Sequence, residues 1–172
     1  MRYLLWAFIL LMVFETPLLA LGNYENGIAA FERGDHETAL REFKFLAEQK
    51  DSRGQYGLGL MYDLGVGVPT DFEEAVKWYQ LSANQGNADA QNNLATMYAE
   101  GEGVERDASR AAKLYENAAQ QGNFDALNNL GVIYLRGAGV PRDYVRAYMW
   151  FRLGEIKGDR AAKMNREFVE TR

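Results

Sequence analysis

The sequence predicts an all-α fold, a right-handed α-solenoid of helical hairpins, and three observations support this. The chain repeats itself every 36 residues, and a fixed period between about 20 and 50 residues is typical of solenoids. Apolar residues recur at helical spacing within each repeat, and paired glycines separate the helical segments. The 172 residues contain no cysteine, so disulfides and thiolate metal sites are excluded.

The N-terminal segment 1–22 predicts a cleavable secretory signal. A basic residue precedes twelve uninterrupted apolar residues, and Ala20 and Gly22 have the spacing of a signal-peptidase site. Twelve apolar residues are short for a membrane span, which needs roughly 20; an uncleaved inner-membrane anchor at residues 3–21 is the alternative. We therefore expect residues 23–172 to form one repeat domain that is periplasmic or secreted.

Three ungapped repeats occupy residues 52–87, 88–123 and 124–159, and each is interpreted as a hairpin of two helices, A and B. Eight positions are identical in all three. A leucine and a tyrosine share one face of helix A, two glycines end it, and a valine packs under the loop. An aspartate caps helix B, an alanine lines its buried face, and a glycine closes the hairpin. In that order, the positions are Leu58/Leu94/Leu130, Tyr62/Tyr98/Tyr134, Gly65/Gly101/Gly137, Gly67/Gly103/Gly139, Val68/Val104/Val140, Asp71/Asp107/Asp143, Ala75/Ala111/Ala147 and Gly86/Gly122/Gly158.

Two further features of the repeats predict how their helices pack. A small residue beside the leucine lets helix B approach closely, and an aromatic residue four positions after the alanine continues the buried stripe of helix B. Asp71 to Glu74 also resembles a capping box. The small residues are Gly59, Ala95 and Gly131, and the aromatic residues are Tyr79, Tyr115 and Phe151.

The flanks of the repeats predict one more hairpin and a cap. Residues 24–51 have the pattern of a tetratricopeptide-style hairpin, with a turn about four residues shorter than the later loops. Residues 160–172 begin like another helix A and then stop, as a capping helix does. On this last helix we expect Met164, Phe168 and Ala161 to share one face, with the charged residues outward.

The pattern AxAQxNLxxMYxxGxGVxxDxxxAxxxYxxAAxQGN resembles Sel1-like repeats, relatives of tetratricopeptide repeats, and the resemblance extends over residues 24–159. The chain is similar in layout to exported bacterial proteins of this kind. It departs from the pattern at Glu105, in place of a loop proline, at Leu127, in place of Gln, and at Glu155, in place of Ala. The resemblance implies a concave groove lined by the A helices, which binds a protein or an extended peptide.

The groove-facing positions of the tetratricopeptide relatives, carried over to this sequence, form the predicted partner-binding set. Tandem Asn pairs stand out, because Asn is a poor helix former whose amide can bond to a partner's backbone. The alternative is that these amides bond to the neighbouring repeat and brace the stack. The set is Arg53, Tyr56, Leu60, Asp63, Asp89, Asn92, Asn93, Thr96, Glu100, Asp125, Asn128, Asn129, Val132, Leu135 and Arg136.

The sequence predicts no catalytic residue, no metal site and no cofactor. The single histidine, His36, falls at a first-turn position of helix B and is interpreted as a half-buried packing residue, without a second His or a Cys to complete a site. Ser-x-x-Lys does not occur. Trp78 and Trp150 have the helical spacing of packing residues rather than of a carbohydrate platform.

Two function classes follow for a non-enzymatic exported repeat protein. One is a periplasmic adaptor or scaffold that binds its partner through the groove. The other is a periplasmic immunity protein, because some exported Sel1-like proteins are similar to antitoxins that neutralise a secreted toxin such as a phospholipase. The net charge of −5 and the lack of any run of Lys or Arg argue against a nucleic-acid partner and a polybasic membrane patch.

Overall fold

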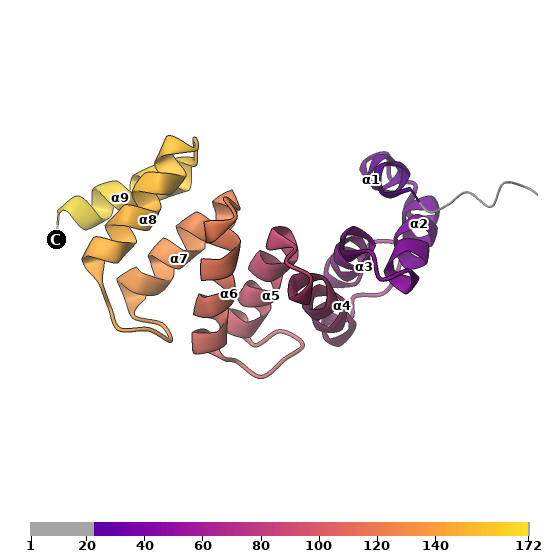
Figure 1. Ribbon diagram of the computed structural model, residues 1–172, viewed down its shortest axis with the longest axis horizontal. Coiled ribbons are helices and arrows are strands. Elements are labelled where there is room, and N and C mark those ends of the chain that lie inside the picture. The colour runs from indigo at the N-terminus through magenta and orange to yellow at the C-terminus, as the bar shows by residue number, and fades with distance from the viewer. Residues whose placement is uncertain (1–22, 172) are drawn as a thin grey trace, which may run out of the picture.

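A computed structural model describes residues 23–171 of the chain, and in this range it consists of nine α-helices and no strand (Figure 1). The predicted all-α solenoid is therefore confirmed, whereas the signal expected at residues 1–22 lies outside the described residues. The helices are α1 (Tyr24–Glu32), α2 (His36–Glu48), α3 (Ser52–Leu64), α4 (Phe72–Asn84), α5 (Ala88–Glu100), α6 (Ala108–Gln120), α7 (Phe124–Arg136), α8 (Tyr144–Ile156) and α9 (Arg160–Glu170).

The hairpins follow one another in a curved row, with α1 and α2 at one end and α8 and α9 at the other (Figure 1). Each helix packs against the next one in the chain, and α3 and α9 also contact the preceding A helices, α1 and α7. Among the described helices, none is long and apolar enough to cross a membrane. Each repeat thus buries its apolar face against its neighbours, as a solenoid requires.

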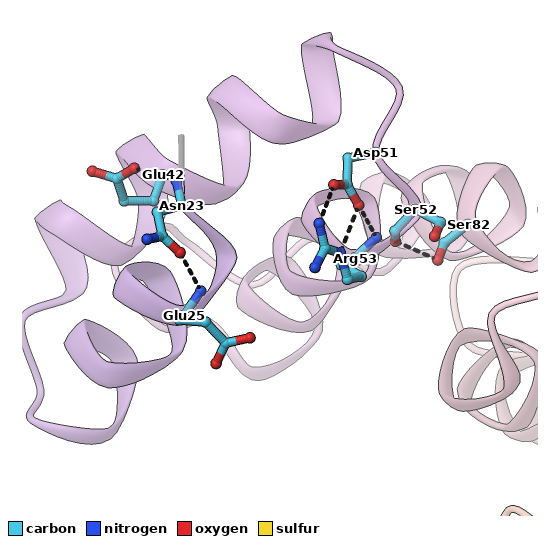
Figure 2. Close-up of polar contacts among 7 residues, drawn as sticks. All are labelled: Asn23, Glu25, Glu42, Asp51, Ser52, Arg53 and Ser82. Atoms are coloured by element: carbon cyan, nitrogen blue, oxygen red, sulfur yellow. Dashed lines mark hydrogen bonds and ion pairs between the residues drawn. The ribbon is translucent and has the colours of Figure 1, made fainter. Parts of the chain in front are cut away.

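Every helix of residues 23–171 begins with an Asn or Asp cap, whose side chain accepts a hydrogen bond from a backbone N–H of the first turn. Losing one such cap typically costs about 1 kcal/mol. Figure 2 shows two of them, Asn23 on the Glu25 N–H and Asp51 on the Arg53 N–H. The caps are Asn23, Asp35, Asp51, Asp71, Asn87, Asp107, Asn123, Asp143 and Asp159.

The capping box predicted at the start of α4 forms in one direction. Asp71 Oδ1 accepts a hydrogen bond from the Glu74 N–H at 3.0 Å, but the Glu74 carboxylate pairs with Lys77 instead of returning to the cap. The Asp71 N–H donates to the Tyr62 carbonyl at 3.0 Å. Because the loop brings the cap against a last-turn carbonyl of α3, the Asp71 N–H and the Tyr62 carbonyl satisfy each other without the glutamate.

The two glycines of each loop have different roles. All six have positive φ angles, and the first of each pair is the left-handed cap that ends helix A. The second also contacts the preceding repeat: a Cβ on Gly139 would lie 2.2 Å from the carbonyl carbon of Ala108, and one on Gly103 would lie 2.3 Å from that of Phe72. The second glycine therefore lets each loop rest on the start of the previous helix B.

The core runs along the array between the A and B helices. Tyr79 and Phe151 are fully buried, as predicted for helix B. A Cβ on Gly131 would lie 2.5 Å from Phe151 Cε1, and one on Gly59 would lie 2.7 Å from Tyr79 Cδ1. The predicted close approach of the two helices at these small residues is confirmed.

The predicted packing face of the capping helix is wrong. Ala162 and Val169 are the buried residues of α9, whereas Met164 and Phe168 are 69% and 49% exposed. The reason is the register of the repeat, because the 36-residue period continues into α9. Ala162 and Val169 lie 36 residues after buried positions of α7, whereas Met164 and Phe168 lie 36 residues after predicted groove positions of α7.

His36 is exposed rather than half-buried. As the first residue of α2, it lies beside Phe31 of α1 with the two ring centroids 6.3 Å apart. Phe72 and Tyr144, at the same position in α4 and α8, are exposed as well. The first residue of these three B helices therefore lies at the surface. Trp78 and Trp150 pack against the core, as predicted.

Candidate functional site

The predicted partner-binding residues lie on α3, α5 and α7, the A helices of the three repeats. Their spacing of three or four residues places them on one side of each helix, and we call this side the groove face. Fourteen of the fifteen residues are partly or largely exposed, whereas Asn92 is buried. The groove face carries four carboxylates, Asp63, Asp89, Glu100 and Asp125, against two guanidinium groups, Arg53 and Arg136.

Two recesses lie between successive A helices on the groove face. The first, about 270 Å³, separates α3 from α5, and the second, about 240 Å³, separates α5 from α7. Each combines apolar and hydrogen-bonding side chains. Of the predicted residues, the first recess is lined by Leu60, Asp63, Asn93 and Thr96, and the second by Glu100, Asn129, Val132 and Arg136.

Other lining residues were missed from the sequence. Glu102 and Ala138 come from the glycine loops and line the first and second recess, and Arg106 lines the second. Arg106 also anchors its loop, because its Nε donates to the Ala99 carbonyl at 2.9 Å. Periodicity carries no signal for these positions, since loop side chains follow no helical spacing.

Tyr79 of α4 lies in the core and bonds to two residues that line the first recess, Asp63 and Asn93. Its hydroxyl donates to Asp63 Oδ2 at 3.0 Å and accepts a hydrogen bond from Asn93 Nδ2 at 3.1 Å. Burial raises the pKa of Tyr79 well above its ordinary value, so the phenol stays protonated. A single hydroxyl of helix B thus joins the A helices of two repeats, α3 and α5, beneath the groove face.

The asparagine amides are joined across the repeats. Asn129 Nδ2 donates to Asn92 Oδ1 at 3.2 Å, and Asn92 Nδ2 donates to Asn93 Oδ1 at 3.2 Å. Asn165 of α9 donates in the same way to Asn128 at 2.8 Å. The bonds between repeats are those expected if the amides brace the stack. Asn93 and Asn129 also line the recesses, and their role toward a partner stays a prediction.

Aromatic and charged side chains meet at the N-terminal end of the groove face. The Arg53 guanidinium lies 5.2 Å from the Tyr24 ring centroid and pairs with Asp51 at 2.7 Å, which lowers the pKa of that carboxyl. Burial and the nearby Asp89 charge raise the pKa of Tyr56 to about 12. Tyr24 was missed because the shorter first turn shifts α1 by four residues; with that shift, it matches Tyr56.

The described residues 23–171 contain no group of three or more His, Asp or Glu side chains placed to hold a metal ion. The groove face offers shape, amides and carboxylates for recognition.

Comparison with known families gives a match to the Sel1 repeat at residues 52–87, 88–123 and 124–159. Comparison with curated proteins gives no match. Among solved structures, a protective antigen present in uropathogenic Escherichia coli strains, which displays an SLR fold, is 36% identical with a TM-score of 0.74, over 80% of this chain and 31% of its own.

Two other structures are similar. A Sel1 repeat protein from Oxalobacter formigenes is 32% identical with a TM-score of 0.71, over 83% of this chain and 44% of its own. Cysteine rich protein B of Helicobacter pylori is 19% identical with a TM-score of 0.59, over 74% of this chain and 92% of its own, a likeness of fold. The chain spans less than half the length of the E. coli and Oxalobacter proteins that it matches.

Proposed function

Because the chain belongs to the Sel1 repeat family, whose repeats mediate protein interactions, we propose that its groove face holds an extended segment of a partner protein. The observation that carries this proposal is the pair of recesses between α3, α5 and α7. Successive A helices repeat the same geometry, so an extended chain lying across them meets a recess at each step.

The chemistry of the recesses suits a polypeptide with basic side chains. Leu60 and Val132 offer apolar contact, and Asn93 and Asn129 carry amides that can pair with a peptide backbone. The four carboxylates outnumber the two guanidinium groups on this face, so the potential favours a positively charged segment. Binding alone requires no catalytic group, so the proposal is a non-enzymatic adaptor or scaffold.

The proposed location is the periplasm, supported by the signal-like composition of residues 1–22. An exported adaptor would meet partners of the cell envelope there. Fractionation of cells that express the tagged chain tests the location, and protein confined to the cytoplasm would contradict it.

The partner-binding role is tested by reversing charge on one face at a time. The test variant is Glu100→Lys with Asp125→Lys, two exposed groove carboxylates, and the control is Glu73→Lys on the outer side of α4. After capture of the partner from periplasm, titration with purified proteins should show at least about tenfold weaker binding for the double variant, about 1.4 kcal/mol. Equal affinities in test and control would contradict the groove assignment. A toxin as the captured partner would instead assign the immunity role.

A further inference from the structure

Glu42 of α2 is a buried carboxylate with little compensating charge. It is 7% exposed, and its Oε2 accepts a hydrogen bond from the backbone nitrogen of Asn23 at 3.1 Å; Figure 2 shows the two residues side by side. Its Oε1 accepts a hydrogen bond from Arg41 Nη2 at 3.4 Å and forms an ion pair with it, but the Arg41 side chain is largely exposed, so solvent screens that charge. A buried carboxylate is costly unless a positive charge pairs with it.

We propose that Asn23 is the first residue of a processed chain and that Glu42 receives its α-ammonium group. Hydrolysis of the Gly22–Asn23 peptide bond by water leaves a carboxylate on Gly22 and an ammonium on Asn23. Ala20 and Gly22 have the small side chains that a signal peptidase requires at that bond. Cleavage then converts the 3.1 Å contact from a neutral donor into a charge-assisted pair, which is about twice as strong.

The pair also removes a conflict at the start of α1. Asn23 is the cap of this helix, and its Oδ1 accepts a hydrogen bond from the Glu25 N–H at 2.9 Å. A positive charge at a helix N-terminus opposes the helix dipole. The Glu42 carboxylate and the Glu25 carboxylate in the first turn offset that charge, so processing fastens α1 onto α2 rather than loosening it.

A cycle of four proteins tests the pairing. The chain from Asn23, which contains every described helix, is prepared with a free or acetylated N-terminus, each with Glu42 or with Glu42→Gln. Acetylation should speed hydrogen exchange of the α1 amides about tenfold in the Glu42 form and leave the Glu42→Gln form nearly unchanged. Glu48→Gln, an exposed carboxylate of the same helix, is the control and should keep the acetylation effect.

Two results would overturn this proposal. One is an acetylation effect of the same size with Glu42 and with Glu42→Gln, which would show that the ammonium does not need the carboxylate. The other comes from expressing the full-length chain and sequencing the N-terminus of the exported protein: a first residue other than Asn23 would overturn the proposal.

A second and independent feature is the outer side of α8. Val145, Met149, Leu153 and Ile156 lie on one face of this helix and are 70%, 57%, 44% and 65% exposed. We call these four residues the α8 stripe. Isolated surface apolar residues are ordinary, but a contiguous apolar strip along a whole helix marks an interaction surface.

The equivalent faces of the earlier B helices show that the α8 stripe is particular to the last repeat. The same four positions are Glu73, Lys77, Leu81 and Asn84 on α4, and Ser109, Lys113, Asn117 and Gln120 on α6. All eight are exposed although further repeats follow both helices. More repeats after α9 would therefore leave the α8 stripe uncovered.

Charge indicates which occupant fits the stripe. Residues 136–172 carry nine Lys and Arg against five Asp and Glu, a net +4, whereas residues 23–135 carry nine against eighteen, a net −9. Arg146 and Arg152 flank the stripe with exposed side chains. A second copy docking stripe to stripe would bring two positive surfaces together. The Arg152–Glu155 pair at its edge, 2.6 Å, would be costly to place in hydrocarbon.

We infer that the α8 stripe docks an amphipathic helix of a partner protein whose apolar face is bordered by Asp and Glu. Apolar residues of that helix pack between those of α8, as in ordinary helix pairing. Its carboxylates meet Arg146 and Arg152, which specifies orientation and partner. This surface is separate from the groove face, so it does not depend on the groove function.

The test uses two synthetic helical peptides with the same leucine stripe, one bordered by Glu and the other by Lys. The chain should bind the Glu peptide at least about tenfold more tightly than the Lys peptide. The variant V145S/M149K/L153N copies the residues of α6, so it keeps a surface that the fold already accepts, and it should lose the Glu peptide. The control Lys113→Gln on α6 should bind it normally.

The other outcomes either overturn the proposal or assign the α8 stripe to a different occupant. Equal binding of both peptides, or no loss in the triple variant, overturns the proposal. Flotation with anionic phospholipid vesicles that the triple variant abolishes would assign the stripe to a membrane surface. Concentration-dependent sedimentation that the triple variant abolishes would assign it to a second copy of the chain.

Discussion

The first two Sel1 repeats, α3–α4 and α5–α6, and the last one, α7–α8, share a backbone but join their helices differently. Gln85 donates to Gln55 at 2.7 Å, and Gln121 donates to Gln91 at 2.8 Å. In the last repeat these positions are Leu127 and Lys157. Leu127 is buried and Lys157 is exposed. The hairpin thus accepts either a paired amide or an apolar side chain, provided that no buried amide is left without its partner.

The last repeat also differs in how its B helix ends. The usual alanine is replaced by Glu155, which pairs with Arg152 at 2.6 Å and with Arg166 of α9 at 2.8 Å. The Arg166 side chain is largely buried, at the position that Leu130 occupies in α7. This departure from the repeat pattern therefore attaches α9 to α8, and an arginine stands in α9 where α7 has a buried leucine.

The largest expected effect comes from breaking the loop contact between the middle and last repeats. Gly139→Ala combines a φ of +74° with a Cβ that would lie 2.2 Å from the Ala108 backbone, and it should lower the free energy of unfolding by about 3 kcal/mol. The control is Gly86→Ala, with a φ of +89° and no atom within 4 Å, which should cost about 1 kcal/mol. Equal costs in urea unfolding would show that the repeats do not touch there.

The amide pairs are tested by giving the last repeat the residues of the others. Leu127→Gln alone should cost about 1 to 3 kcal/mol, because a buried amide lacks its partner. Adding Lys157→Gln should recover about 1 kcal/mol of that loss, an interaction energy that a double-mutant cycle from urea unfolding reports. Strict additivity would mean that the two positions do not pair across the hairpin.

A smaller effect is expected where the first hairpin differs from all the others. Lys50 has a φ of +62°, at the position where the later units have Gly86, Gly122 and Gly158. A left-handed backbone conformation costs a residue with a side chain about 1 to 2 kcal/mol. Glycine avoids this strain, but part of the gain is offset because glycine loses more conformational entropy on folding. Lys50→Gly should therefore raise stability by about 0.5 to 1 kcal/mol in thermal or urea unfolding. A lower midpoint would indicate that the Lys50 side chain stabilises the fold.

The smallest effect concerns the pH dependence of the ion pair between Glu155 of α8 and Arg166 of α9. The hydrogen bond from Arg152 and the charge of Arg166 lower the pKa of Glu155 below its ordinary value of 4.5. A lowered folded-state pKa means that the stabilisation is present above pH 4.5 and is lost as the pH falls through the folded value. The melting temperature of the wild type should exceed that of Glu155→Gln near neutral pH, and the two should converge as the pH falls below 4.5 and through the folded-state pKa of Glu155. A gap that stays constant with pH would contradict the ion pair.

Much of the fold and part of the candidate site follow from the sequence, because the signals involved are local. The repeat period, the Asp and Asn caps and the positive-φ glycines each depend on a few neighbouring residues. The predicted groove positions came from the resemblance to tetratricopeptide repeats, and eight of them line the two recesses. Glu102, Arg106 and Ala138 were missed because loop side chains follow no helical spacing.

The contacts that only the tertiary structure decided depend on how each helix is rotated and displaced relative to the one before it. That geometry places the Tyr79 hydroxyl between Asp63 and Asn93, the Asn23 nitrogen on Glu42 and Arg166 on Glu155. These partners are 11 to 19 residues apart in the chain. Local patterns specify which residues face inward within a helix, but the meeting of two side chains from different helices is set by packing of the whole array.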